Sequence, residues 1–328
     1  MKKIAYFLSF LIVFIMIFSC LTGCTTTKER KEFVVVCTVF PVYDWMRNVV
    51  GENDNVDIVL LLDDGLDLHN FQPTMDDMAV MSDCDVFIYV GGESDDWVDD
   101  VLTTVKNTKM TTVNLIEVLG DKAREEEEIE GAEDAHEHEH EHEEEETGYD
   151  EHVWLSLKNA EIFVKKLADV MAVKDEKNAE KYQRNAAIYN ESLSELDAEY
   201  EKAVGEANVK TLVFADRFPF LYLFKDYGLQ YFAAFSGCST ETSASPETVA
   251  FLAGKLNELN LRYILQIEGQ THDIAISVRD ASESKNQTIT SLNSLQTITA
   301  KDVKNGVTYL SVMQSNLETL KTVLKNGG

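Results

Sequence analysis

The sequence is poor in basic residues. Its 328 residues include 29 Lys and Arg against 58 Asp and Glu, so the formal net charge at pH 7 is -29. A protein that binds nucleic acid needs a basic stripe to neutralise phosphates, and no such stripe is visible along the chain. The composition therefore excludes a nucleic-acid partner.

Paired cysteines are also lacking. Cys20 and Cys24 belong to the N-terminal segment, and Cys37, Cys84 and Cys238 are widely separated, with no CxxC pair. An odd number of remaining thiols cannot form a disulfide framework. Cys37 and Cys84 lie in apolar, strand-like surroundings, which favours buried, inert thiols over ligands.

Long apolar runs are absent except near the N-terminus. Residues 4–20 form an almost uninterrupted apolar run of 17 residues after two lysines. This run is short for a membrane span, which needs ~20 residues, and it ends at residues 21–24 in Leu-Thr-Gly-Cys, the pattern of a lipoprotein signal. We expect a signal peptide over residues 1–23, lipid attachment at Cys24 and a polar tether over residues 24–32.

Fingerprints of common enzymes are missing as well, since no Ser-His-Asp, Walker or dinucleotide-binding pattern occurs. Two overlapping H-E-x-x-H matches begin at His136 and His138. A zinc protease needs that motif on an ordered helix with an apolar face. Every second residue here is glutamate, so we interpret both matches as accidents of low complexity.

These matches lie in an acidic segment, residues 121–151, which holds 17 acidic residues and two basic ones. Such a composition cannot bury a core, so we expect a disordered loop over residues 121–149. Four of its histidines alternate with glutamate: His136, His138, His140 and His142. We interpret them as an auxiliary metal-collecting loop, and a merely solvating acidic linker is the alternative.

Short β-branched runs alternate with helical patterns through the rest of the chain, which predicts parallel α/β sheets. Strands are expected at residues 33–39, 56–62, 85–90, 112–115, 210–214, 230–234, 262–266 and 288–292. Helices are expected at residues 41–50, 74–81, 97–106, 157–173, 177–204, 219–227, 246–256, 272–281 and 309–324.

The helix predicted at residues 177–204 is unusually long. It carries apolar residues at three- and four-residue spacing and would span ~40 Å. The chain length favours two domains, so we predict an α/β fold of two lobes, residues 33–175 and 207–328. Each lobe has a mainly parallel sheet flanked by helices, one long rigid helix over residues 176–206 joins them, and a ligand cleft lies between them.

Three histidines lie outside the acidic segment. His69 follows a predicted strand, at the sheet edge where α/β proteins bind ligands. His152 directly precedes a predicted helix, and His272 lies at a helix start, where a solvated cap residue is favoured over a ligand. Taken singly, His69 could also be an exposed loop residue.

The segments around His69 (residues 63–73) and His152 (residues 150–160) resemble two motifs, Gly-x-Asp-Pro-His-x-Phe-x-Pro and Asp-x-His-x-Trp-x-x-Pro-x-Asn-Ala. These motifs are typical of the zinc/manganese ABC-transporter solute-binding lipoproteins, cluster A-I, of the high-affinity zinc-uptake type. The resemblance covers essentially the whole mature chain. It extends to residues 38–44, 226–229, 306–310 and 316–320.

The resemblance implies a four-ligand site, with two histidines from the first lobe and two residues from the second. Here the third position falls on Arg217 and the fourth near residues 293–296, which end in Gln296. Arginine cannot ligate a cation, so the chain departs from the family pattern in its second lobe. The nearby acids that could replace these ligands are Asp216, Glu241 and Glu268.

We predict that His69, His152, Glu268 and Asp216 bind the metal, although Glu268 could instead pair with Arg217. Two neutral imidazoles with carboxylate oxygens suit zinc, and also manganese or ferrous iron. The histidine-rich segment favours zinc, Zn2+, with Mn2+ as the alternative.

The resemblance implies a non-enzymatic, monomeric receptor on the extracytoplasmic face of the cell membrane. It would deliver metal to an ABC permease and its ATPase subunit. Two alternatives remain open: a surface zinc hydrolase, which needs an open coordination position and a base, and a metal-dependent adhesin.

Overall fold

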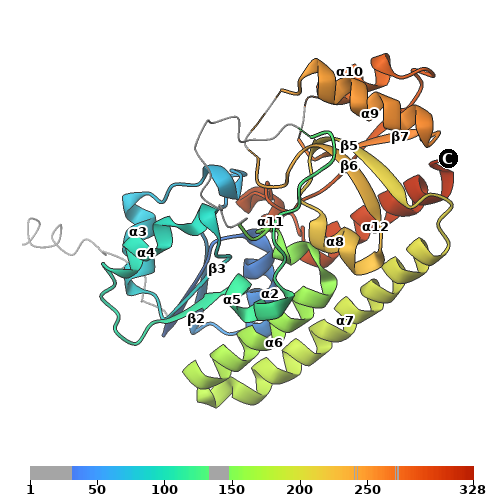
Figure 1. The fold of residues 1–328 in the computed structure, drawn as a ribbon. Helices are drawn as coiled ribbons and strands as arrows, with labels where there is room; N and C mark the ends of the chain where they lie inside the picture. The colour runs from blue at the N-terminus through green and yellow to red at the C-terminus, as the bar shows by residue number, and fades with distance from the viewer. Residues whose placement is uncertain (1–31, 133–147, 240, 242, 270, 272) are drawn as a thin grey trace, which may run out of the picture. The chain divides into compact units, whose positions relative to one another are not determined.

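The computed structural model describes residues 32–132, 148–239, 241, 243–269, 271 and 273–328. Residues Phe33–Gly328 form one compact unit. Within it, two sheets of four parallel strands lie in two lobes flanked by helices, so the predicted α/β fold is confirmed (Figure 1). None of the helices in these described ranges combines the length and the apolar character needed to cross a bilayer.

The first lobe is built on a sheet with the strand order β2-β1-β3-β4. Its strands are β1 (Phe33–Cys37), β2 (Val56–Leu60), β3 (Val86–Tyr89) and β4 (Thr111–Asn114). Its helices are α2 (Phe40–Val50), α3 (Met75–Asp83), α4 (Trp97–Leu102) and α5 (Leu115–Leu119). Val35, Val36 and Cys37 on the inner strand β1 are fully buried, which explains why this strand reads as a continuous β-branched run.

The second lobe repeats this arrangement with the strand order β6-β5-β7-β8. Its strands are β5 (Thr211–Arg217), β6 (Gln230–Phe235), β7 (Tyr263–Ile267) and β8 (Thr288–Leu292). The helices after β5 are α8 (Leu221–Tyr227), α9 (Pro246–Glu258), α10 (Asp273–Ala281), α11 (Ala300–Lys304) and α12 (Tyr309–Asn326). The pairing of β5 with β6 shifts register between Phe214 and Arg217, so the last residues of β5 leave the regular ladder.

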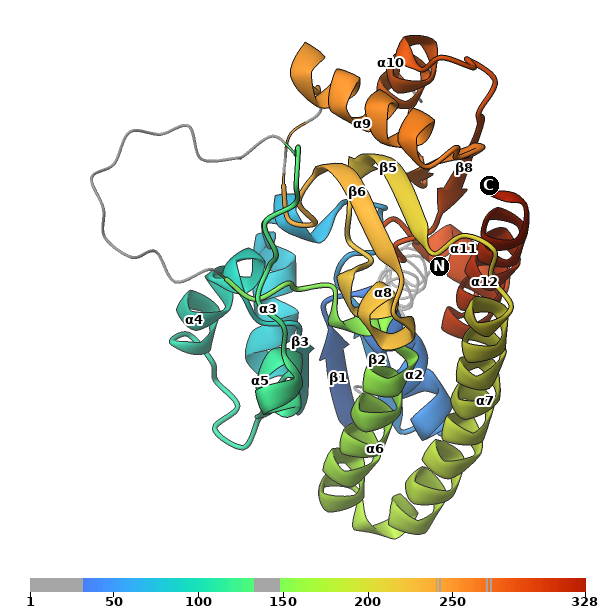
Figure 2. The ribbon, with the colours of Figure 1, turned by 45° about the vertical axis from the view of Figure 1, so that its right-hand side comes forward.

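Two long helices separate the sheets in sequence. Helix α6 (Leu157–Lys174) and helix α7 (Ala179–Gly205) form a hairpin through a short 3-10 turn (Glu176–Asn178) (Figure 2). The buried face of α7 follows the predicted spacing and consists of Tyr182, Ala186, Tyr189, Leu193, Leu196, Tyr200 and Val204. The long linking helix predicted from that spacing is confirmed.

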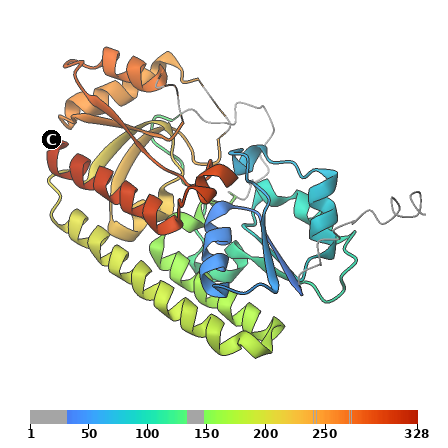
Figure 3. The same ribbon diagram turned by 180° about the vertical axis from the view of Figure 1, so that it is seen from behind.

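Helix α7 contacts both lobes. The Tyr189 hydroxyl lies 3.5 Å from an oxygen of Asp44 on α2. The Tyr200 hydroxyl donates to the Met313 carbonyl on α12, over 2.6 Å. Figure 3 shows α12 beside α7 along the back of the molecule.

The two lobes share one hydrophobic core. A single buried cluster runs from Val35 in the first sheet through Trp154 and Leu193 to Leu324 in α12. A smaller cluster lies between the second sheet and helices α9 and α10. Because the main core is continuous, the lobes cannot swing apart without exposing buried apolar surface to water.

Part of the acidic segment is ordered, contrary to the expectation of a disordered loop over all of residues 121–149. Residues Glu125 and Tyr149 form an antiparallel bridge, and the Glu126 amide donates to the Gly148 carbonyl over 2.9 Å. Ala123 and Ile129 pack against the core. The prediction of disorder rested on the number of charged residues and did not take these two apolar side chains into account. The remaining residues of this segment, 133–147, lie outside the described residues.

Replacing Leu193 by Ala tests the role of α7 as a shared support. Leu193 is fully buried, whereas Ile188 on the same helix is 57% exposed. We expect Leu193→Ala to lower the free energy of unfolding by about 2–5 kcal/mol and Ile188→Ala to change it by less than about 0.5 kcal/mol. Urea denaturation of both variants measures the difference, and equal effects would contradict the burial pattern.

Candidate metal centre

His69 lies in a short 3-10 helix (Leu68–Asn70) that follows strand β2. Asp67 caps this helix, because its side-chain Oδ1 accepts a hydrogen bond from the His69 amide over 3.1 Å. The His69 side chain is only 5% exposed. The exposed-loop alternative for His69 is therefore wrong.

His152 precedes a second 3-10 helix (Val153–Leu155), which leads into α6. Its side chain is fully buried, and its ring packs at the edge of Trp154. Its backbone amide donates to Asp150 Oδ1 over 2.9 Å. The chain is thus fixed on both sides of the imidazole.

The two imidazoles face each other through their Nε2 atoms, which are 3.4 Å apart. On the other side of each ring, His69 Nδ1 lies 2.7 Å from Ser94 Oγ and 3.5 Å from Glu151 Oε2, and His152 Nδ1 lies 3.3 Å from Asp150 Oδ1. Neither His152 Nδ1 nor Glu151 Oε2 has a hydrogen-bond partner among the described residues, but the negative charge of each carboxylate favours the tautomer that carries its proton on the nearby Nδ1. The Nε2 lone pairs then point at each other, and a proton or a metal ion between them relieves the repulsion.

The protonation of the pair agrees with this arrangement. Burial and the charge of His152 lower the pKa of His69 to about 3. Burial alone would also lower the pKa of His152, but the negative charge of Asp150 outweighs it and the pKa is raised. The surroundings therefore favour a proton on His152 over a proton on His69.

Glu151 supports His69 from behind. It accepts a hydrogen bond from the Ser94 amide over 2.8 Å, and burial raises its pKa to about 7 against the opposing hydrogen bonds from Ser94. Gly92 makes room for this side chain, because a Cβ at that position would lie 2.4 Å from Glu151 Oε1. Partners of this kind orient a ligating histidine.

Cys238 is a candidate ligand that the sequence analysis did not identify. Among the described residues, His69, His152 and Cys238 form the one group of three potential metal ligands whose donor atoms all lie within 4.8 Å of one another. The only sequence signal for it was the position of Cys238 in a loop just after strand β6. Burial raises the pKa of its thiol, as do the nearby charges of Asp150 and Glu126.

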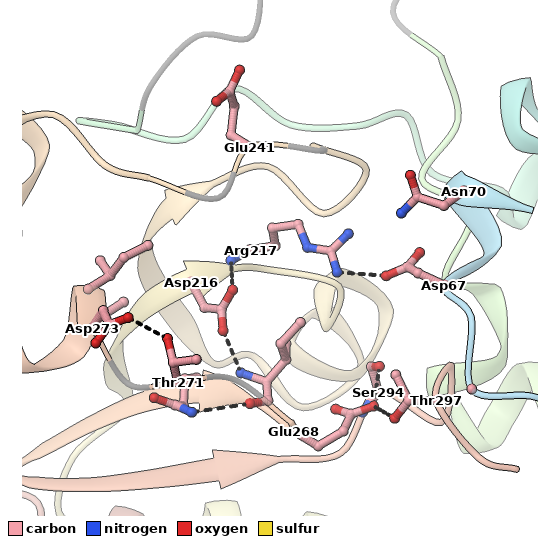
Figure 4. Close-up of a pocket in the computed structure, with 15 residues that line it drawn as sticks. Asp67, Asn70, Asp216, Arg217, Glu241, Glu268, Thr271, Asp273, Ser294 and Thr297 are labelled. Carbon is pink, nitrogen blue, oxygen red and sulfur yellow. Dashed lines mark hydrogen bonds and ion pairs between the residues drawn. The ribbon is translucent and has the colours of Figure 1, made fainter.

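Glu268 and Asp216, the other two predicted ligands, are not brought to the histidine pair. Glu268 accepts hydrogen bonds from the Ser294 amide and hydroxyl, each over 2.8 Å, and from Thr297. Asp216 accepts from the backbone amides of Arg217 and Ile267 (Figure 4). Both carboxylates instead hold the backbone or side chains at the ends of strands. Their positions in the sequence do not reveal these hydrogen bonds, and so did not show that the two carboxylates would lie outside the histidine group.

Arg217 pairs with Asp67, whereas the sequence analysis offered Glu268 as its partner. The Arg217 guanidinium donates to Asp67 Oδ2 over 2.6 Å (Figure 4). It also donates to the Ser239 carbonyl over 3.2 Å. Burial alone would raise the pKa of Asp67, but the charge of Arg217 outweighs it and the pKa is lowered. The ion pair joins the second lobe to the turn that carries His69.

A cavity of about 260 Å³ lies between the lobes beside this ion pair. Its polar lining comes mainly from the second lobe, and Figure 4 shows Asp67 and Asn70 facing it from the first. The acidic or amide side chains that line it are Asp67, Asn70, Asp216, Glu241, Gln266, Glu268 and Asp273. The predicted cleft between the lobes therefore exists, and Asp216, Glu241 and Glu268 line it.

Gln296 ends the segment of residues 293–296, near which the fourth ligand position implied by the resemblance falls. It is 6% exposed, and its Oε1 atom has no hydrogen-bond partner among the described residues. Cys37 and Cys84 are free and buried, as predicted. Cys24, His272 and the four histidines His136, His138, His140 and His142 lie outside the described residues.

A double-mutant cycle on Asp67 and Arg217 tests the contact between the lobes. The two side chains are 12% and 13% exposed, so we expect a coupling of about 1 kcal/mol or more between Asp67→Asn and Arg217→Gln. The exposed pair Glu318 and Lys321 is the matched control and should couple by less than about 0.5 kcal/mol. Urea denaturation supplies the free energies of unfolding, and equal couplings would contradict a structural role for the buried pair.

Comparison with known proteins identifies the family of this chain. Residues 35–323 match the family described as zinc-uptake complex component A, periplasmic. The chain is 31% identical over 333 residues to the zinc-binding lipoprotein AdcA of Streptococcus pneumoniae, covering 100% of this chain and 62% of AdcA. It is 29% identical over 317 residues to the high-affinity zinc uptake system protein ZnuA of Bacillus subtilis, covering 95% of this chain and 94% of ZnuA.

Solved structures show the same fold. The zinc-bound ZnuA-like domain of AdcA from Streptococcus pneumoniae aligns with a TM-score of 0.69 and 28% identity, over 89% of this chain and 99% of that domain. The metal-dependent lipoprotein YcdH of Bacillus subtilis aligns with a TM-score of 0.71 and 25% identity, over 89% and 99%. The chain spans 58–62% of the length of the AdcA proteins that it matches. Because the family match covers most of the residues, this chain belongs to the zinc-uptake complex component A family.

Proposed function

We propose that this chain is the extracytoplasmic zinc receptor of an ABC-type metal importer. The observation that carries the proposal is the 3.4 Å separation of the two buried Nε2 atoms of His69 and His152. Two nitrogens bound to one tetrahedral zinc at about 2.0–2.1 Å lie about 3.3 Å apart. The pair is therefore spaced for one zinc ion.

The identity of the cargo follows from donor chemistry and from the relatives. Imidazole nitrogen suits zinc better than manganese, which favours oxygen donors. The AdcA and ZnuA relatives are named for zinc binding and zinc uptake. Zn2+ is thus the proposed cargo, and Mn2+ is the weaker competitor.

The receptor role implies partners and a location. An ABC permease and its ATPase subunit would take the ion from the cleft, with the receptor held as a monomer at the membrane by a lipid on Cys24. The lipid attachment rests on the sequence pattern around Cys24 and on a relative named as a lipoprotein. No catalytic step is needed, so the protein is proposed not to be an enzyme.

Calorimetric titration tests zinc binding. The chain from residue 25 onward should be used with residues 133–147 deleted, which removes the four clustered histidines and keeps the ordered contacts of Glu125 and Glu126. We expect one zinc per chain. Loss of an outer-sphere partner typically weakens metal binding about 10–100-fold. His69→Ala and His152→Ala should each weaken zinc binding by more than that, because each removes a direct ligand.

Met75→Ala is the control for these variants. Met75 begins helix α3, shortly after His69 in the chain, and is 79% exposed. Its loss should change the zinc affinity less than about threefold, because an exposed side chain contributes about 0.5 kcal/mol or less. If zinc binding disappears when residues 133–147 are deleted, the cleft is not the receptor site and the proposal fails.

Competition between metals tests the cargo. We expect zinc to bind at least about 100-fold more tightly than manganese, because affinity for nitrogen ligands rises from manganese toward zinc. The measurement is a titration of manganese-loaded protein with zinc, followed by metal analysis of the dialysed protein. Retention of manganese in the presence of equimolar zinc would argue for a manganese receptor.

A further inference from the structure

We propose that the thiolate of Cys238 is the third zinc ligand and sets the preference of this site for zinc over manganese. The inference rests on the proposed receptor function and deepens it by naming the second-lobe donor. The family position that would supply this donor is Arg217, which cannot ligate a cation. The structure offers a different residue, from a different loop, at the histidine pair.

The geometry selects Cys238 from the candidate donors of the second lobe. Its sulfur lies within 4.8 Å of a ring nitrogen of both His69 and His152. Glu268 and Asp216 instead accept hydrogen bonds from Ser294 and Ile267, among others, and are not part of this group. Nitrogen and sulfur bound to one zinc at about 2.0 and 2.3 Å lie about 3.5 Å apart, so a shift of about 1 Å would complete the site.

The backbone around Cys238 is shaped for a close approach. Gly237 lets the loop pass against the histidine segment, because a Cβ there would lie 2.9 Å from the Phe218 carbonyl oxygen and 3.3 Å from His152 Nδ1. The Cys238 amide donates to Glu126 Oε1 over 3.1 Å. The loop is therefore held from two sides with its thiol next to the imidazoles.

Arg217 contributes to the same arrangement without binding metal. Its guanidinium donates both to Asp67, next to the turn of His69, and to the carbonyl of Ser239, next to Cys238. One side chain thus connects the two loops that carry ligands. Asp67 also keeps the positive charge of Arg217 occupied in an ion pair, which reduces its repulsion of a bound cation.

Burial and the nearby carboxylates raise the pKa of the Cys238 thiol, so the thiolate forms when zinc supplies an opposing positive charge. When zinc binds, the S–H bond of Cys238 breaks and a sulfur–zinc bond forms, and this proton, with any proton on His152 Nε2, leaves to solvent. Two neutral imidazoles and one thiolate leave a net charge of +1 with Zn2+, which the carboxylates of Asp150, Glu126 and Glu151 around the thiol offset. Sulfur is a soft donor that selects zinc over manganese.

Cobalt(II) substitution tests the inference directly, because a cobalt–thiolate bond gives an intense charge-transfer band in the near ultraviolet. The chain from residue 25 onward with residues 133–147 deleted should show this band when loaded with cobalt. The same protein with Cys238→Ser should lose it. Cys84→Ala is the matched control, since Cys84 is a free thiol buried against Met110, and it should keep the band.

Zinc affinity and thiol protection supply readouts that a folding defect would not mimic. Cys238→Ser should weaken zinc binding by more than the loss of about 10–100-fold that is typical of an outer-sphere partner. It should leave manganese binding within a factor of about three, so that the zinc-to-manganese ratio falls. Zinc should also slow alkylation of Cys238 by iodoacetamide, measured by mass spectrometry, and His152→Ala should remove this protection.

The outcomes separate this inference from the receptor function. If cobalt gives no charge-transfer band, and Cys238→Ser binds zinc as tightly as the parent while His69→Ala does not, the thiolate ligand is overturned and the receptor stands. If the parent chain binds no zinc at all, the receptor function itself fails. A Cys238→Ser protein that lost zinc and manganese binding equally would also overturn a selective role for sulfur.

Discussion

The site depends on one constraint: two imidazole nitrogens that face each other across 3.4 Å in a buried place. Two lone pairs at this distance repel unless a cation lies between them, and the surrounding structure holds the rings in this position. Asp150 fixes His152, while Ser94 and Glu151 fix His69. A zinc ion between the two Nε2 atoms would relieve that repulsion. Because the two rings are held in place by these neighbours, binding would require little reorganisation.

Much of the fold was predictable because local sequence and tertiary burial agree. The run of residues 33–37 is β-branched because strand β1 is covered on both faces, and α7 shows its seven buried positions as a plain helical period. The eight strands and the long helix follow from such patterns. The short helices α5 (Leu115–Leu119) and α11 (Ala300–Lys304) were not predicted, because five residues contain too little periodicity to be recognised. The contacts of Ala123 and Ile129 were hidden by the acidic residues around them.

The pairing of His69 and His152 was predictable from the sequence, because both lie in segments whose local patterns single them out. The residue that the second lobe places beside them depends on where loops meet in the folded chain, and no local sequence pattern shows that. A register shift at the end of β5 and the close approach at Gly237 decide that Cys238, rather than Asp216 or Glu268, comes to the histidines. The partner of Arg217 was equally hidden, since Asp67 lies 150 residues away in sequence.

The continuous core constrains how cargo could leave. Because the main cluster of buried residues joins both lobes through α7 and α12, opening the whole cleft would expose a large apolar surface, which costs free energy in proportion to its area. Movement of loops costs far less. Arg217 contacts two loops that carry proposed ligands. It binds Ser239 in the loop of Cys238 and Asp67 beside the turn of His69. A partner that drew Asp67 away from Arg217 would release both loops together and separate Cys238 from the histidines, while the sheets and the core stayed in place. The residue that departs most clearly from the family ligand pattern would then be the one that couples capture to release.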